Sequence, residues 1–287
     1  MKHYTITEFR KQYPTDDVCL EKLFQVKYGK LKGCPSCGVA GVEFKRISTR
    51  RCYQCVECGY QLYPTQGTIF EKTRTPLTYW FYSIYLYTVT RNGVAAKELE
   101  RQLGVTYKTA FRMAKHIRIL MDPIPEGKRK KLEGIVEIDE TFIGGKVPHT
   151  DHRPLKGKIP VLAMVERQGR VIAEQIPDIK GYTLLHHITH NVDTTARVMT
   201  DELNTYKNLE RLGYAHDFVK HRMKQYGKGD IYTNTVEGFF SMVKRTIEGT
   251  YLHVSSKYLQ LYVDEITFRY NHRKQPTEMF EAILKRA

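Results

Sequence analysis

Two carboxylates near the middle of this 287-residue chain have the spacing of a shared strand face. Residues 134–145 are rich in β-branched side chains and end in two glycines, which is typical of a strand closed by a turn. Because side chains alternate along a strand, Glu137 and Asp139 share one face and the apolar residues beside them occupy the other. Burying carboxylates on a core strand is costly unless they are paired. The two acids are therefore expected either to form salt bridges or to bind a metal ion.

Two further acids lie at the ends of predicted elements. Asp201 ends the β-branched run 196–202, and Glu237 lies in a helical segment that begins near residue 233. Lys244 follows Glu237 by seven residues, or two helical turns, and so lies on the same helix face. A carboxylate that faces a metal ion and a lysine that faces a phosphate, on one helix, are what phosphodiester chemistry needs.

Each acid alone has a simpler structural explanation. Asp139 could pair with one of the many arginines of the chain. Asp201 could cap a helix that starts at Glu202, and Glu237 could form a surface pair with a lysine. The position of all three at the ends of predicted elements, together with Lys244, favours the metal site.

Four cysteines form two Cys-x-x-Cys motifs, Cys34-Pro-Ser-Cys37 and Cys55-Val-Glu-Cys58, each followed by glycine. Their separation matches a zinc ribbon in which each motif contributes two thiolates to one ion. Cys52 completes a third such motif with Cys55, but the glycine after each of the two motifs favours their four cysteines as ligands. In so short a segment the zinc ion is first a folding element. The basic residues of the segment are candidates for DNA contact: Lys45, Arg46, Arg50 and Arg51.

Residues 95–113 have the pattern of a helix-turn-helix. One helix is expected to end near Leu103, Gly104 makes the turn, and Thr106 can cap the second helix. Many pairs of antiparallel helices share this pattern, so the interpretation as a DNA-binding motif also relies on the positive charge and the neighbouring ribbon. The expected DNA contacts lie at the start of the second helix: Tyr107, Lys108, Thr109 and Arg112.

The acids must be positioned by a mixed α/β domain. Two strand-like runs joined at Gln168-Gly169 follow the opening strand and predict an antiparallel meander, and helical and strand-like runs alternate after it. A linker with two prolines, a glycine and a basic run precedes this domain. The expected organisation is a helical lead-in (1–30), a zinc ribbon (31–70), a helix-turn-helix region (71–121), a basic linker (122–133) and a catalytic domain (134–287).

The charge balance indicates a polyanionic partner. The chain has 46 Lys and Arg against 31 Asp and Glu, a net charge of +15, and nucleic acid is the usual partner of such a protein. The basic residues cluster at 128–131, at 220–228 and at Lys244-Arg245. We find neither an apolar run that could span a membrane nor the apolar core of a signal peptide, so a cytoplasmic, nucleoid-associated location is expected. In that compartment six cysteines favour metal or free thiols over disulfides.

Taken together, these motifs resemble the DDE-type insertion-sequence transposases of the ISXO type. Members of that family carry a zinc ribbon and a helix-turn-helix before an RNase H-like catalytic domain. The resemblance covers nearly the whole chain and rests on Cys34-Pro-Ser-Cys37, Cys55-Val-Glu-Cys58-Gly, Gly67-Thr-Ile-Phe-Glu, Val136-Glu-Ile-Asp139-Glu-Thr, Thr200-Asp201, Thr233-Asn-Thr-Val-Glu237-Gly-Phe-Phe and Arg269-Tyr-Asn-His-Arg.

The resemblance implies a recombinase that binds the terminal inverted repeats of its own element and transfers DNA strands to target DNA. Asp139, Asp201 and Glu237 would bind two Mg²⁺ ions, or Mn²⁺, for an in-line displacement at phosphorus. Lys244 and Arg245 would hold phosphate oxygens. Bringing two DNA ends together would require a homo-oligomer.

Some family members have asparagine as the third ligand. Asn234 lies three residues before Glu237 and close to the same helix face, so it is an additional or substitute ligand. Glu237 is preferred because a carboxylate suits a hard divalent cation best. Two other functions stay open: a non-catalytic DNA-binding regulator derived from a transposase, and an RNase H-like nuclease or junction resolvase.

Overall fold

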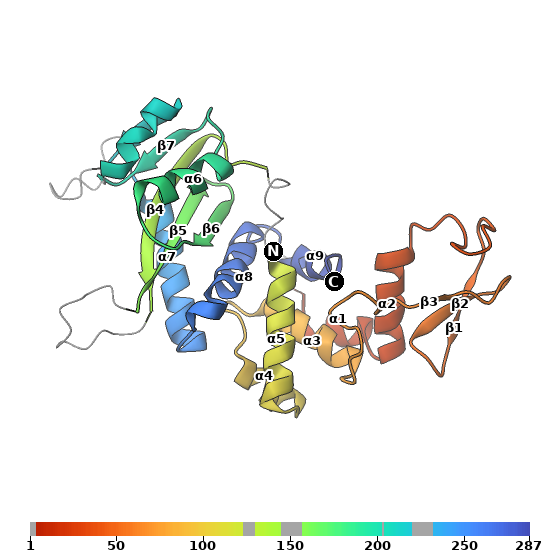
Figure 1. Cartoon of the computed structure of the whole chain (residues 1–287). Helices are drawn as coiled ribbons and strands as arrows, with labels where there is room; N and C mark the ends of the chain where they lie inside the picture. Colours follow the sequence, from red (N-terminus) through yellow and green to blue (C-terminus); the bar gives the residue numbers. More distant parts are fainter. Residues whose placement is uncertain (1–3, 123–129, 145–156, 203, 220–231) are drawn as a thin grey trace. The chain divides into compact units, whose positions relative to one another are not determined.

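The computed structural model describes residues 4–122, 130–144, 157–202, 204–219 and 232–287. The chain divides into two compact units, Met1–Leu120 together with Gln275–Ala287, and Met121–Lys274 (Figure 1). Most of the expected basic linker, residues 128–129 of the first basic cluster and all of the second cluster, residues 220–228, lie outside the described residues. None of the helices that are described is long and apolar enough to cross a lipid bilayer.

The first unit surrounds a helix that is apolar on nearly every side. In this helix, α3 (Leu77–Val89), the side chains of Trp80, Phe81 and Tyr87 are fully buried, as expected for a core helix. The other helices of the unit are α1 (Ile6–Gln12), α2 (Asp16–Tyr28), α4 (Ala96–Leu103), α5 (Tyr107–Met121), the 3₁₀-helix η6 (Pro276–Glu278) and α9 (Met279–Leu284).

A three-stranded antiparallel sheet completes the first unit. It consists of β1 (Phe44–Ile47), β2 (Cys52–Cys55) and β3 (Gln61–Leu62), in that order. The sheet lies within the segment 31–70 for which the cysteine spacing predicts a zinc ribbon. So small a sheet has little core of its own, which is why the ligation of its cysteines matters for folding.

The last residues of the chain belong to the first unit. The sequence pattern predicts a catalytic domain that continues to residue 287, whereas residues 275–287 group with the N-terminal helices. The physical reason is the apolar face of α9, where Phe280 and Leu284 are buried. The ring of Phe280 lies 6.0 Å from that of Phe81 on α3.

The second unit is built on a mixed five-stranded sheet in the order β6-β5-β4-β7-β8. The strands β4 (Ile135–Ile143), β5 (Ile159–Glu166) and β6 (Val171–Gln175) form the expected antiparallel meander, while β7 (Arg197–Thr200) and β8 (Ala215–Phe218) run parallel to β4. This mixed α/β architecture is consistent with the RNase H-like domain that the resemblance implies. The remaining elements are α6 (Gly181–Asn191), η1 (Asn204–Asn208), η2 (Glu210–Leu212), α7 (Asn234–Thr246), the π-helix η4 (Ile247–Tyr251), η5 (Ser256–Tyr258) and α8 (Leu259–Asn271).

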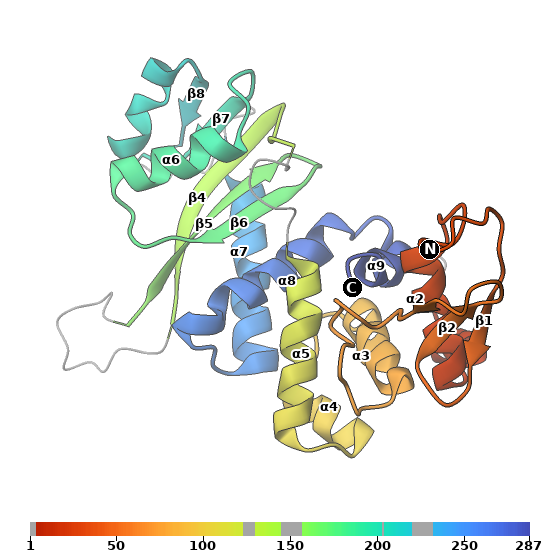
Figure 2. The same cartoon turned by 45° about the vertical axis from the view of Figure 1, so that its right-hand side comes forward.

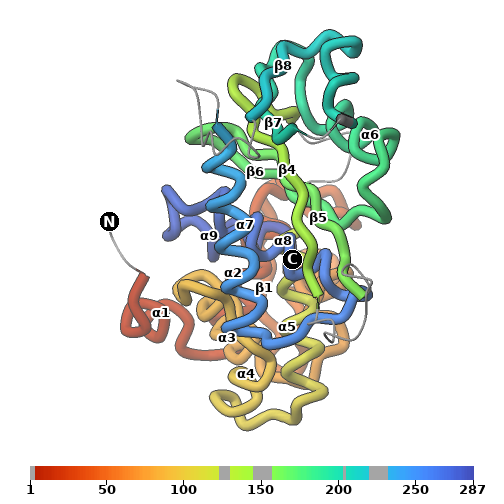
Figure 3. The backbone as a smooth tube through the Cα atoms, turned by 90° about the vertical axis from the view of Figure 1, so that its left-hand side faces the viewer, coloured from red at the N-terminus to blue at the C-terminus, as the bar shows by residue number. Residues whose placement is uncertain are grey.

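Helices cover both faces of this sheet, and the alternation of β4 contributes to both cores. Val136 and Ile138 pack with Leu184 and Ile188 of α6 on one face (Figure 2). The opposite face packs against α7 and α8, and α7 lies alongside β4 (Figure 3). Glu137 and Asp139 therefore lie on the α7 side of the sheet, as the period of two predicts.

Candidate active site and zinc ribbon

Glu137 is a fully buried carboxylate surrounded by hydrogen-bond donors. Its Oε1 accepts hydrogen bonds from Arg167 Nε at 2.7 Å and from Thr235 Oγ1 at 2.9 Å. Its Oε2 accepts hydrogen bonds from the backbone N–H groups of Thr235 at 2.7 Å and Val236 at 3.1 Å. These N–H groups belong to the first turn of α7 and have no partner within the helix, so Glu137 caps α7 from the sheet.

Arg167 joins the end of β5 to the segment that leads into α7. Its side chain is mostly buried, donates a hydrogen bond to the carbonyl of Tyr232 at 2.8 Å and lies 3.5 Å above the ring of Tyr232. The sequence leaves two possibilities for a carboxylate on β4, a salt bridge or a metal ion, and Glu137 forms the salt bridge. Its position fixes where α7 begins relative to the strand.

Asp201 lies beside Asp139 because of the register of two parallel strands. β4 pairs with β7 so that Glu137 is opposite Met199. Asp139 lies two positions beyond Glu137, and Asp201 lies two positions beyond Met199, just after β7 ends. Adjacent strands are about 4.8 Å apart. The two aspartates therefore lie on neighbouring segments just beyond the paired residues, where the charge of Asp201 acts on Asp139.

The environment of Asp139 shows the effect of this convergence. Burial raises the pKa of its side chain from 3.8 to about 7, and the nearby charges of Glu140, Asp201 and Glu237 add to the rise. A hydrogen bond from the backbone N–H of Glu140, at 2.8 Å, opposes it. The negative charges that disfavour the ionisation of Asp139 are a donor set that a hard divalent cation would neutralise.

The acids are spaced more widely than a preformed ligand cage. In the described parts of the chain, the only group of His, Cys, Asp or Glu ligand atoms all within 4.8 Å of one another is that of four cysteines. The three acids thus interact electrostatically, but their carboxylate oxygens do not all lie within 4.8 Å of one another.

The exposed face of α7 carries the remaining candidates. Asn234 is its first residue, and Asn234, Glu237, Lys244 and Arg245 are all exposed. Glu237 Oε1 accepts a hydrogen bond from Thr233 Oγ1 at 3.0 Å, which orients the carboxylate at the start of the helix. Arg245 Nε donates to the carbonyl of Ser241 at 3.2 Å.

On the opposite face of β4, Glu140 forms a contact that sequence analysis misses. The hydroxyl of the fully buried Tyr206 donates a hydrogen bond of 2.6 Å to Glu140 Oε2. Burial raises the pKa of Glu140, and the bond from Tyr206 partly offsets this rise. Tyr206 lies 66 residues further along the chain in a short 3₁₀-helix, and no sequence pattern signals the pairing.

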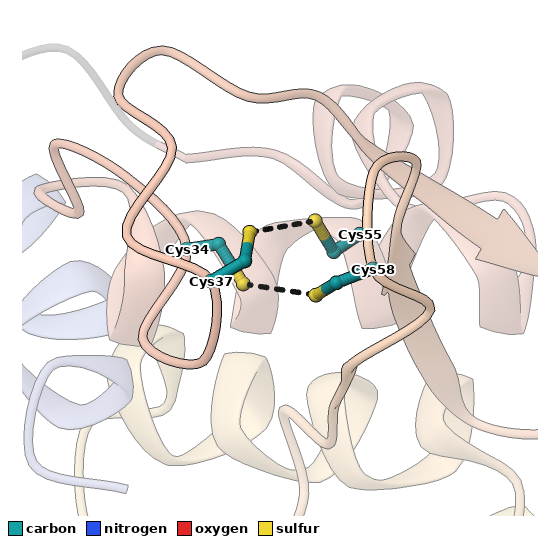
Figure 4. Close-up of side chains that lie close together, drawn as sticks. All are labelled: Cys34, Cys37, Cys55 and Cys58. Carbon is teal, nitrogen blue, oxygen red and sulfur yellow. Dashed lines mark hydrogen bonds between the residues drawn. The ribbon is translucent and has the colours of Figure 1, made fainter.

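The four cysteines of the two motifs lie together, as predicted (Figure 4). The sulfurs of Cys34 and Cys58 are 3.7 Å apart, and those of Cys37 and Cys55 are 4.0 Å apart. Four sulfurs about 2.3 Å from a central zinc ion would be about 3.8 Å apart in a tetrahedron. The geometry therefore fits a structural zinc ion. Although burial opposes it, hydrogen bonds from backbone N–H groups and neighbouring thiols lower the pKa of Cys34 to about 7, which favours the thiolate.

Cys52 is not part of this cluster. It is buried on β2, and its sulfur lies 3.8 Å from Gln61 Oε1. Two of the ribbon's candidate DNA-binding residues form ion pairs within the protein. Arg46 binds Asp17 at 2.8 Å and Arg51 binds Asp16 at 3.3 Å, both at the start of α2, while Lys45 and Arg50 are exposed.

The expected helix-turn-helix is formed by α4 and α5. Gly104 ends α4 in the left-handed conformation with φ of 64°, and Thr106 Oγ1 accepts a hydrogen bond from Thr109 N at 3.4 Å at the start of α5. The buried face of α5 includes Ala110, Met113 and Ile117. The candidate contacts Tyr107, Lys108 and Arg112 are exposed on the other side, and Thr109 is half-buried.

Comparisons with known proteins agree with this arrangement. Residues 131–271 match the family described as the ISXO2-like transposase domain, and residues 14–61 match the transposase zinc-ribbon domain. The chain is also 26% identical to an uncharacterized protein in transposable element ISH50 of Halobacterium salinarum, over 92% of this chain and 94% of that protein. The chain therefore carries an ISXO2-like transposase domain, preceded by the transposase zinc ribbon.

Proposed function

We propose that this chain is the transposase of an insertion sequence, which binds the terminal inverted repeats of the element and cleaves and joins DNA strands. The observation that supports this function best is the convergence of acids on the α7 side of the sheet. The register of β4 and β7 brings Asp201 beside Asp139, and Glu237 adds to the rise in the pKa of Asp139. Each of the three acids comes from a different element, as in a site assembled for catalysis.

The three acids are the proposed ligands of two Mg²⁺ or Mn²⁺ ions. When bound, the ions would activate a water or a DNA 3′-hydroxyl and stabilise the leaving oxygen. Asp139 offers the oxygen that does not accept the backbone N–H of Glu140, since that bond holds Oδ1. Thr233 orients Glu237, and Asn234, exposed one residue later, is a further oxygen donor at the helix start.

The basic side chains of α7 are the proposed phosphate contacts. Lys244 lies two turns beyond Glu237 on the same exposed face, about 10 Å along the helix. Arg245 is exposed beside it. A strand whose scissile phosphate lies at the acids would thus pass its neighbouring phosphates along α7 toward Lys244.

Recognition of the element's ends is assigned to the first unit. The exposed start of α5 presents Tyr107, Lys108 and Arg112 in the manner of a recognition helix, with Thr109 beside them. A structural zinc ion held by the four-cysteine cluster would stabilise the ribbon next to it in the chain. Synapsis of two ends would require at least a dimer.

A cleavage assay on the element's own ends tests this function. The substrate is a duplex that carries the short inverted repeats found beside the gene, with Mg²⁺ or Mn²⁺. Wild-type protein is expected to cut or join it, and Asp139→Asn and Asp201→Asn proteins are expected to bind it without cutting. Glu210→Gln, which removes an exposed acid of the same unit, is the matched control.

The same assay separates the two candidates for the third ligand. Glu237→Gln should abolish cleavage if Glu237 is the ligand, whereas Asn234→Ala should abolish it if asparagine takes that place. Full activity of Asp139→Asn protein would contradict the proposed site. End-specific binding without cleavage by the wild type under any metal condition would instead support a DNA-binding regulator.

A further inference from the structure

A strained and highly exposed leucine follows the C-terminal end of α7. Leu252 has φ of 62° and ψ of −51°, a conformation that a bulky side chain rarely adopts. The N–H of His253 donates to the carbonyl of Tyr251 at 2.7 Å and closes a tight three-residue turn around Leu252. The side chain of Leu252 is 81% exposed, the largest exposed fraction among the large hydrophobic residues of the described chain. Neither local backbone preference nor burial explains a leucine at this position.

Buried contacts on both sides hold the strained turn in place. The Tyr251 hydroxyl donates to both oxygens of Glu265, at 2.7 and 2.9 Å, and Glu265 is fully buried on α8. The ring of Tyr251 also packs edge-on against Tyr262, with centroids 4.6 Å apart. After the turn, Val254 returns to the core. Leu252 is therefore presented on a rigid support, as strained functional residues are.

The turn lies next to the proposed path of the DNA strand. Leu252, His253 and Lys244 line one hollow of about 100 Å³, together with the end of β4. Lys244 and Glu237 are about 10 Å apart on the exposed face of α7. The residues of this helical stretch that line the hollow run from Lys244 to Glu248, about 10 to 16 Å beyond Glu237. Because DNA advances about 3.4 Å per base pair, the hollow lies about three to five base pairs from a phosphate held at the acids.

We propose that Leu252 is a wedge that inserts between two base pairs of the bound duplex and unstacks them, about three to five base pairs from the scissile phosphate. Apolar side chains on DNA-bending proteins act in this way, and leucine is one of those used. Opening a step beside the cleavage site frees the end to enter the acidic site. The inference rests on the proposed function, since the acids define where the strand is held.

The surroundings of Leu252 favour DNA over a protein partner. A specific protein interface needs an apolar patch, and large apolar residues elsewhere in this segment, such as Ile247 and Val254, are buried. The exposed neighbours are instead polar or glycine, from Glu248 to Lys257. Lys244 and His253 would contact phosphates beside the opened step. Glu248 also lines the hollow and would repel phosphates, so the backbone is expected on the Lys244 side.

Fluorescence of 2-aminopurine tests the wedge directly. The base is placed in turn at each of the six base pairs nearest the cleavage site of the element's end, and the protein carries Asp139→Asn so that the duplex stays uncut. Fluorescence is expected to rise at one or two positions, about three to five base pairs from the cleavage site, when the protein binds. Leu252→Gly should lose this rise, and Leu252→Met should retain it.

The thermal stability of Leu252→Gly protein shows whether the variant is folded. Glycine accepts positive φ, so Leu252→Gly protein should melt at a higher temperature than its parent. Gln168→Gly is the matched control, because Gln168 has φ of 61° at the β5–β6 turn and should gain stability without a change in fluorescence.

An unchanged fluorescence rise in Leu252→Gly protein would overturn the wedge. So would a loss of self-association in that variant, by sedimentation, with unchanged fluorescence, since Leu252 would then contact a second copy. If the wild type cleaves the DNA but fluorescence shows no Leu252-dependent rise, only the wedge is refuted. A Leu252-dependent rise without cleavage by the wild type refutes only the proposed chemistry.

Discussion

Replacing Asp139 by asparagine should stabilise the metal-free protein at neutral and alkaline pH, although it removes a proposed catalytic ligand. Burial and neighbouring acids raise the pKa of Asp139 from 3.8 to about 7. The folded state therefore binds this proton more tightly than the unfolded state does. Stability is highest below the unfolded pKa and is lost as the pH rises through the folded one. Asparagine has a similar shape and no charge, so the variant escapes this loss.

The size of the effect follows from the two pKa values. The step from 3.8 to about 7 corresponds to about 4 kcal/mol in the free energy of unfolding, lost by the wild type between roughly pH 4 and pH 8. About half of it, roughly 2 kcal/mol, falls between about pH 5.5 and about pH 8.5. The advantage of Asp139→Asn over the wild type should grow by that amount across this interval. Added Mg²⁺ should reduce the advantage, because a bound cation neutralises the wild-type acids.

The measurement must follow the second unit separately from the first. The single tryptophan, Trp80, lies on α3 in the first unit and does not report on the sheet that holds Asp139. Urea unfolding in EDTA, followed by hydrogen-exchange mass spectrometry of peptides from β4 and β7, gives the required free energies. Peptides from α3 are the internal control, and Glu210→Gln protein shows the effect of removing an exposed acid.

If the free energies of unfolding of the wild type and Asp139→Asn fall by the same amount from pH 5.5 to pH 8.5, the raised pKa of Asp139 is refuted. Asp139 would then not be the group that resists ionisation, and the electrostatic convergence with Asp201 and Glu237 would be wrong. An Mg²⁺-dependent stabilisation of equal size in both proteins would show that the cation binds elsewhere.

Three further outcomes follow from the contacts described. Metal analysis of purified protein should show that Cys55→Ser loses the bound zinc and that Cys52→Ser retains one ion per chain. Zinc loss from both variants would place Cys52 among the ligands. Glu137→Gln should destabilise the second unit by about 3 kcal/mol in urea, because Arg167 loses its buried partner, and an unchanged stability would exclude this pairing. Gly104→Ala should cost about 1 kcal/mol in thermal unfolding because φ is positive there, and a neutral effect would contradict the left-handed turn.

The local elements of this chain could be predicted because their signals are short-range. The period of two in β4 predicts that Glu137 and Asp139 share a face, and both lie on the α7 side. Two Cys-x-x-Cys motifs predict a four-sulfur cluster because each motif fixes two ligands locally. Likewise, Gly104 predicts the turn between α4 and α5 because few other residues accept its conformation.

The partners of these residues could not be predicted because they are distant in sequence. Arg167 is one of many arginines, and the N–H groups that bind Glu137 lie 98 and 99 residues away. Tyr206 meets Glu140 only because two elements on one sheet face are packed together. The return of α9 to the first unit depends in the same way on which apolar face is available, and helical periodicity does not carry that information.

Two buried carboxylates explain how α7 can serve as a rigid platform. Glu137 binds the N–H groups at its start, and Glu265 binds Tyr251 just beyond its end, and both acids are fully buried. Between these contacts the exposed face carries Glu237 and Lys244. Functional groups on an element fixed at both ends keep their spacing. The same fold therefore supplies four donors to Glu137 but only a backbone N–H to Asp139 among the hydrogen bonds described, and leaves Asp139 with like charges that a cation would have to balance.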